Sequence, residues 1–420
     1  MIKQILQQGL IISGTRLIAL SMPMIDMMML GRSTAEDVAN FTVANQIIQV
    51  FVILIISLSV GINILVPKKN TKSSDINNII GYSIVVGFII TLVSIVSGFL
   101  FLKGSSSGDV YYILVLGLFP LSVFVGISAI MESKGFTRNV LIITAIMSFS
   151  NATLNYILIN TLPVVASNSV SLATTMLRYA FCFIIIMMAY KTSPVKIRVG
   201  FSRALNSTLL KYGKSESITS FFFTGSIAFM FYFLSKTATT YNIANLGVTF
   251  NFINTVFIVF VGFSISLTIF LSKKEKILIT DIKKIVVLSL FYVASISLLL
   301  SYFSKEISHL YVNDRLSGLA DDIRLSVLII AIDGLAISLI SILRVKGYPV
   351  LPPLFRLSFV VFGIPSGIAL YSYYGNQGLI LCLSLANAIA LTLSIAYLMK
   401  IIMKSSDFTE KDVNLKKAEI

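Results

Sequence analysis

Residues 39–69, ANFTVANQIIQVFVILIISLSVGINILVPKK, align without a gap on residues 244–274, ANLGVTFNFINTVFIVFVGFSISLTIFLSKK. Ala-Asn opens both stretches, Val43 meets Val248, and Lys-Lys closes both. Each stretch is long and apolar enough to cross a bilayer, which takes about 20 residues. The offset is about half the chain and spans six apolar runs, so it preserves orientation in the membrane. The pattern predicts a parallel duplication whose halves are related by an axis along the membrane normal, as in transporters.

A second pair of sequences repeats at nearly the same offset. Lys134-Gly135 follows the fourth apolar run and Lys346-Gly347 follows the tenth. Because apolar residues match by chance, the shared offset and the shared loop position support the duplication more than any single identity does.

Composition excludes a water-soluble enzyme. The 420 residues are 56% hydrophobic and 12% charged, with a mean hydropathy of +0.92, whereas soluble domains carry about 25% charged residues. Apolar runs recur along the whole chain and are too long and uniform for the alternating strands of a membrane barrel. The sequence therefore predicts an all-α polytopic membrane protein with twelve transmembrane helices in two six-helix lobes. We expect the spans at residues 8–30, 38–66, 79–102, 110–131, 139–161, 168–190, 215–235, 242–271, 285–303, 323–343, 350–373 and 377–399.

The basic residues test this map, because cytoplasmic loops are enriched in Lys and Arg. With a cytoplasmic N-terminus, 24 of the 33 basic residues fall in inner segments and four fall in spans. The outer loops hold the other five: Arg32, Lys103, Lys236, Lys305 and Arg315. This asymmetry predicts a multi-pass protein of the cell inner membrane with both termini in the cytoplasm. It also explains the net charge of +15 without a nucleic-acid partner.

The repeat and the linker composition predict the domain boundaries. Residues 1–191 form the N-terminal lobe and residues 215–403 form the C-terminal lobe. A stretch at 192–214, rich in Ser, Lys and Arg, is the expected cytoplasmic linker, and residues 404–420 form a cytoplasmic tail. We expect the protein to act as a monomer in the lipid bilayer.

Two carboxylates lie well inside predicted spans, Asp26 in the first and Asp333 in the tenth. Ionisable groups inside a bilayer are costly and default to functional candidates. Burial favours the neutral, protonated form of a carboxyl, whereas a bound Na⁺ favours the ionised form. We therefore predict a proton or Na⁺ site at Asp26 or Asp333. The alternative is that each carboxylate only accepts a hydrogen bond or pairs with an arginine.

Polar side chains of the fifth span are candidate partners of these acids. Asn151 and Asn155 are spaced i and i+4 and so share one helix face. Their amides could bind Na⁺, accept a hydrogen bond from a protonated Asp26, or serve as ordinary helix-helix contacts.

Arginines also lie in the spans. Arg178 is close to the middle of the sixth and is expected to face an aqueous cavity or pair with an acid. Arg356 lies just inside the start of its helix, where snorkelling to the headgroups is the simpler interpretation.

Motifs of soluble chemistry are absent from the sequence. It contains no Walker P-loop and no HExxH, GxSxG or CxxC motif, and its two cysteines lie in apolar runs. We predict that the protein is not an enzyme and uses no cofactor beyond a coupling H⁺ or Na⁺.

Pro23 to Gln46 contains Ile-Asp-Met-Met-Met-Leu-Gly followed by Glu-Asp-Val-Ala-Asn. This stretch resembles the first-helix signature of the MATE (multidrug and toxic compound extrusion) transporters, which belong to the wider MOP flippase superfamily. Asn151 to Ile159 is similar to the fifth helix, and Asp333-Gly334 through Leu343-Arg344 is similar to the tenth. Gly363-Ile364-Pro365 fits the eleventh helix. The chain also departs from the pattern, since Val345-Lys346 interrupts the usual Leu-Arg-Gly.

The resemblance implies antiport of an amphipathic small molecule against an inward H⁺ or Na⁺ gradient. It places Asp26 on the N-lobe acid, Asn151 and Asn155 on its partners, and Asp333 on the C-lobe acid. Thr224 falls where related transporters carry a glutamate, which weakens a C-lobe sodium site. The resemblance further suggests a substrate cavity that includes three polar side chains: Arg178, Thr224 and Gln46.

The sequence thus favours a secondary active exporter of an amphipathic drug or metabolite. An alternative within the same superfamily is a flippase of lipid-linked oligosaccharide or glycolipid, because buried arginines outnumber buried acids and a pyrophosphate headgroup prefers arginine.

Overall fold

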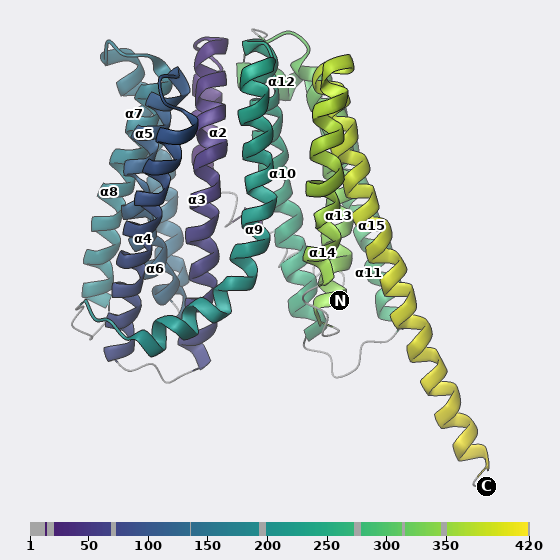
Figure 1. Ribbon diagram of the computed structural model, residues 1–420. Helices are drawn as coiled ribbons and strands as arrows, with labels where there is room; N and C mark the ends of the chain where they lie inside the picture. Colours follow the sequence, from purple (N-terminus) through teal and green to yellow (C-terminus); the bar gives the residue numbers. More distant parts are fainter. Residues whose placement is uncertain are drawn as a thin grey trace. The chain divides into compact units, whose positions relative to one another are not determined.

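The structure is a computed structural model that describes residues 13–14, 21–68, 73–134, 136–192, 199–272, 279–312, 316–345 and 351–418. All regular elements within these ranges are helical, as predicted. The helices follow one another as α2 (Ser21–Leu30), α3 (Ala35–Lys68), α4 (Ser73–Phe101), α5 (Ser106–Leu116), α6 (Leu118–Ser133), α7 (Thr137–Thr161), α8 (Ala166–Thr192), α9 (Arg203–Thr237), α10 (Thr240–Ser272), α11 (Ile279–Tyr302), α12 (Ser304–Val312), α13 (Leu319–Val345), α14 (Leu351–Ser358), the π-helical turn η1 (Phe359–Gly363) and α15 (Ile364–Ala418) (Figure 1).

Nine segments of the described residues are long and apolar enough to cross a membrane. The longest, Leu354–Lys400, has 47 residues, which at about 1.5 Å per residue is roughly twice the thickness of a bilayer core. Gly375 interrupts it with φ 57° and ψ −144°, a conformation that favours glycine. This break lies between the predicted spans 350–373 and 377–399, so the segment holds two crossings.

The internal repeat is visible in the helix boundaries. Helix α3 begins at Ala35 and α10 begins at Thr240, 205 residues later. Helix α6 ends at Ser133 and α13 ends at Val345, 212 residues later. Both offsets equal those between the repeated sequence segments. The two halves therefore repeat their helix boundaries as well as their sequence.

The chain packs into two compact units. One comprises the described parts of Ile18–Asn251 and Glu306–Leu319. The other comprises the described parts of Met1–Leu17, Phe252–Lys305 and Ala320–Ile420. These units reflect packing, whereas the predicted lobes 1–191 and 215–403 reflect the repeat. The lobe boundaries therefore stay a prediction.

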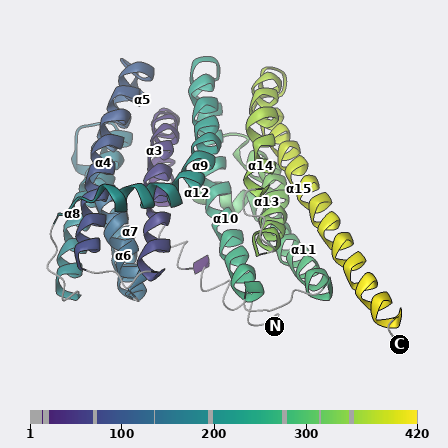
Figure 2. The same ribbon diagram turned by 60° about the horizontal axis from the view of Figure 1, so that its bottom comes forward.

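Helix α9 begins inside the predicted linker. The stretch from Arg203 to Tyr212 holds no Gly or Pro and is helical, so only residues 199–202 of the described linker are non-helical. With 35 residues, α9 is about 50 Å long, more than a bilayer core needs. Its first turns run across the end of the first unit before the helix turns alongside it (Figures 1 and 2).

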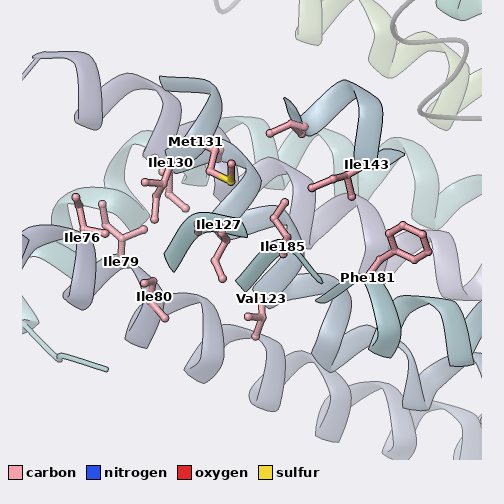
Figure 3. Close-up of a cluster of buried hydrophobic side chains, with 14 of the residues drawn as sticks. Ile76, Ile79, Ile80, Val123, Ile127, Ile130, Met131, Ile143, Phe181 and Ile185 are labelled. Carbon is pink, nitrogen blue, oxygen red and sulfur yellow. The ribbon is translucent and has the colours of Figure 1, made fainter. Parts of the chain in front are cut away.

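The first unit has a contiguous apolar core between α4, α6, α7 and α8. Large side chains from all four helices fill it, among them Ile79, Ile127, Ile143 and Ile185 (Figure 3). Helix α3 packs against α5, α6 and α9, and α2 packs against α7 and α8. The contact between α2 and α7 places Asp26 beside the fifth predicted span.

The outward face of α4 is apolar. Phe88, Leu92 and Val96 are spaced four residues apart and are 58%, 47% and 58% exposed. A row of exposed large apolar residues is unfavourable in water and suits a helix that faces acyl chains.

The second unit is built around α10, α11 and α13. Phe263, Ile285 and Leu339 belong to its apolar core, and Phe263 stacks on Tyr292 at a centroid distance of 4.4 Å. The Ser264 and Ser341 hydroxyls are hydrogen-bonded at 2.6 Å, which joins α10 to α13.

Small residues bring α4 and α6 into close contact. A Cβ added at Gly126 would lie 2.0 Å from Ser83 Oγ, and one added at Gly87 would lie 2.8 Å from Ser122 Cβ. Ser122 Oγ donates to the Ser83 carbonyl at 2.8 Å. Paired small residues spaced four apart, with a hydrogen bond across the helices, are typical of membrane helix packing.

We expect Gly126→Val to destabilise the protein by about 1–3 kcal/mol, the usual cost of overpacking a tight interface. Thermal unfolding in detergent checks this. Gly225→Val is the control, because a Cβ at Gly225 meets no heavy atom within 4 Å. Equal losses in the two variants would contradict the close α4–α6 contact.

Candidate functional site

The Asp26 carboxylate is buried in the first unit and is held by three neutral donors. Asn151 Nδ2 and Asn155 Nδ2 donate to Oδ1 at 2.5 and 2.7 Å. Thr174 Oγ1 donates to Oδ2 at 3.1 Å. Asp26 is 3% exposed, and the three donors are equally well covered. The structure thus brings Asp26, Asn151 and Asn155 together.

Helix α7 presents both amides because of their spacing. Asn151 and Asn155 lie one turn apart on the buried face, whereas Phe149 and Tyr156 of the same helix are 76% and 67% exposed. The i, i+4 spacing therefore delivers two side chains to one carboxylate oxygen.

Helix α2 is fixed on both sides of Asp26. Asn251 Nδ2 of α10 donates to the Pro23 carbonyl at 3.1 Å, and Tyr311 OH donates to Asn251 Oδ1 at 3.1 Å. Beyond the carboxylate, Gly31 lies so near the Tyr311 backbone that an added Cβ would be 2.2 Å from its oxygen. These contacts set the position of Asp26 along the bundle.

Thr174 was missed by the sequence reasoning. It lies on α8 one turn before Arg178, which the sequence did single out. The available signal was the group of small hydroxyl residues in the sixth span: Ser169, Ser171, Thr174 and Thr175.

Arg178 supplies a positive charge near this site. Its guanidinium interacts electrostatically with Asp26, while its Nη1 is buried with no hydrogen-bond partner. Gly117, which separates α5 from α6, makes room for it, since a Cβ there would lie 2.9 Å from Arg178 Cδ.

Two oxygens at the site lack donors. Asn151 Oδ1 and Asn155 Oδ1 are buried without a hydrogen-bond partner, which is costly for a polar atom. Amide orientation follows from the surrounding hydrogen bonds, so turning either amide would direct its oxygen at Asp26. A carboxylate, two amide oxygens and a hydroxyl would then be available to a hard cation, which prefers oxygen ligands.

Asp333 has a different environment in the second unit. It lies on α13, is 9% exposed, and pairs with Arg356 of α14. The expectation that Arg356 snorkels to the headgroups is wrong: its guanidinium lies against Asp333 and over the Phe257 ring, 5.3 Å from the centroid. A buried carboxylate within reach is a stronger partner than a distant headgroup.

The three predicted substrate residues lie on separate helices. Gln46 is buried on α3, Thr224 is half-buried on α9, and Arg178 is half-buried on α8. The structure also has a small cavity between α3, α4 and α6, bordered by Ile55, Tyr82 and Ser122, and none of the three lines it. Their role in substrate binding stays a prediction.

The chain is similar in sequence to a known protein family and to two curated proteins. Residues 12–104 match the MatE family model. The chain is 27% identical over 273 residues to "Probable multidrug resistance protein NorM" of Oceanobacillus iheyensis, an alignment that covers 59% of this chain and 60% of that relative. It therefore spans less than two thirds of that relative's length. Identity to the protein of the same name in Thermotoga maritima is 22% over 340 residues, covering 74% of this chain and 72% of the relative.

A solved structure extends the likeness to the whole fold. The inward-facing conformation of a multidrug resistance MATE family transporter of the MOP superfamily matches with a TM-score of 0.78 at 12% identity, covering 92% of this chain and 96% of that one. The chain thus resembles MATE transporters in part of its sequence and in its fold. The MATE fold confirms the predicted class, an all-helical membrane protein of two six-helix lobes.

We expect Asn155→Leu to destabilise the folded protein by about 1–3 kcal/mol, because a buried carboxylate loses a donor. Asn160→Leu on the same helix is the matched control, since Asn160 is exposed and donates to the Tyr156 carbonyl of its own helix. Thermal unfolding of both variants in detergent measures the difference. Indistinguishable curves would argue against a structured Asp26 site.

Proposed function

We propose that the chain is a secondary active exporter that moves amphipathic small molecules out of the cell in exchange for inward H⁺ or Na⁺. The likeness to proteins named for multidrug resistance supports the substrate class. The basic residues of the inner segments support an inner-membrane protein with cytoplasmic termini. The observation that carries the proposal is the buried Asp26 carboxylate, surrounded by neutral donors and by two amide oxygens without partners.

The chemistry at Asp26 is reversible charge compensation. In the ionised state the carboxylate accepts from Asn151, Asn155 and Thr174. Protonation would make the carboxyl a hydrogen-bond donor. The unpartnered Oδ1 atoms of Asn151 and Asn155 would be available to accept from it. Na⁺ would draw the same amide oxygens toward the carboxylate. Each event rearranges hydrogen bonds between α2, α7 and α8.

Such a rearrangement can drive transport only if the cation has different affinities for two conformations. Helices α2, α7 and α8 meet at Asp26, so loading the site changes the contacts among three helices at once. We propose that this loading stabilises the conformation that releases substrate outside. The predicted part of Asp333 in coupling is a separate question, because that carboxylate already has a counter-ion.

The flippase alternative has less support. It rested on an excess of buried arginines over buried acids, but Arg356 is paired with Asp333. Arg178 Nη1 remains the one observation in its favour. Transport that persists in Asp26→Asn and is lost in Arg178→Glu would favour the flippase.

We expect Asp26→Asn to reduce cation-driven export at least about tenfold, which corresponds to about 1.4 kcal/mol. The assay follows ethidium in proteoliposomes of the full chain, once with a pH gradient without Na⁺ and once with a Na⁺ gradient at constant pH. One of these gradients should drive ethidium in the wild type and fail in the variant.

Asp109→Asn is the control for this assay, because Asp109 is an exposed carboxylate at the start of α5. It should transport like the wild type. Full gradient-dependent export by Asp26→Asn would eliminate the mechanism, and no gradient-driven ethidium movement in the wild type would count against multidrug export.

A further inference from the structure

The carboxylate of Asp333 is occupied by a side chain of its own unit. Arg356 Nη2 contacts Asp333 Oδ1, and the two side chains are 24% and 12% exposed. Asp333 lies within α13, and Arg356 lies five residues after the start of α14. The pair is therefore tertiary and largely shielded from water.

Arg356 is also held from a second direction. Its guanidinium carbon lies 5.3 Å from the centroid of the Phe257 ring of α10, a distance at which the ring attracts a cation. Three helices of the same unit thus fix the cation at the carboxylate.

The two intramembrane carboxylates therefore differ in how their charge is balanced. Asp26 has amide and hydroxyl donors, which carry no net charge, and Arg178 interacts with it only through space. Asp333 has a directly bonded cation. An exchangeable cation could therefore neutralise Asp26. At Asp333 it would have to compete with the Arg356 guanidinium, which is covalently part of the chain.

We propose that Arg356 is a tethered counter-ion that takes the place of an exchangeable cation at Asp333. Under the proposed function, on which this inference rests, transport is then coupled to a single exchangeable cation at Asp26. Removing the Arg356 charge uncovers a second site, because a shielded carboxylate without a partner must take up H⁺ or Na⁺ to be neutral.

The test counts exchangeable cations per molecule in the purified full chain in nanodiscs. Bound Na⁺ is measured with ²²Na⁺ at equilibrium, and H⁺ uptake is measured as the pH change of a weakly buffered suspension moved from alkaline to mildly acidic medium. Wild type and Asp333→Asn should give the same count. Arg356→Gln should exceed Arg356→Gln/Asp333→Asn by about one cation per molecule, the difference expected from one carboxylate.

Two controls separate charge from folding. Arg356→Lys keeps a cation at the position and should match the wild type, and Arg324→Gln removes an exposed arginine of α13 and should also match it. The double variant replaces the pair with neutral groups, so it should unfold at a higher temperature than Arg356→Gln, which leaves a shielded charge. Each count is taken on the monodisperse fraction from size exclusion.

The inference is overturned if Asp333→Asn alone lowers the wild-type count by one, or if Arg356→Gln and the double variant bind equal numbers of cations. The comparison of wild type with Asp26→Asn in the same assay tests the proposed function instead. If wild type and Asp26→Asn bind equal numbers of cations, the proposed function is contradicted. The comparison of Arg356→Gln with the double variant can still be interpreted in that case.

Discussion

The site depends on one constraint: the negative charge of a buried carboxylate must be balanced. Burying an ionised carboxylate is expensive. Asp26 accepts hydrogen bonds from Asn151, Asn155 and Thr174, and Arg178 acts on it only through space. Those bonds come from α7 and α8, so the position of α2 in the bundle is tied to the charge state of one side chain. Under the proposed function, this connection would let a bound cation act on helix packing.

The two halves of the repeat balance the charge of a buried carboxylate in different ways. In one, the Asp26 carboxylate has neutral hydrogen-bond donors. In the other, the Asp333 carboxylate meets Arg356, and the Phe257 ring supports the guanidinium. Duplication of a six-helix unit supplies two similar frameworks, and single substitutions can then assign them separate tasks. Under the proposed function, coupling would then need only one of the two carboxylates.

Periodic features of the sequence predicted most of the fold and half of the site. The offset between Ala35 and Thr240 at two helix starts, and the shared face of Asn151 and Asn155, both follow from local spacing. Pairing of Asp333 with an arginine was one of the predicted alternatives, and the structure shows it. Thr174 and the identity of that arginine could not be predicted in this way, because each depends on which helices meet in three dimensions. Snorkelling was the reasonable expectation for Arg356 from its place near a helix start, and the tertiary contact with Asp333 overrode it.

The claim that Asp26 exchanges its cation is tested most directly by infrared difference spectroscopy of the reconstituted protein. Spectra are recorded on adding Na⁺ and on acidification, and compared with those of Asp26→Asn. The account predicts a carboxyl or carboxylate band that changes in the wild type and is missing from the variant. Identical difference spectra for the two proteins would contradict it.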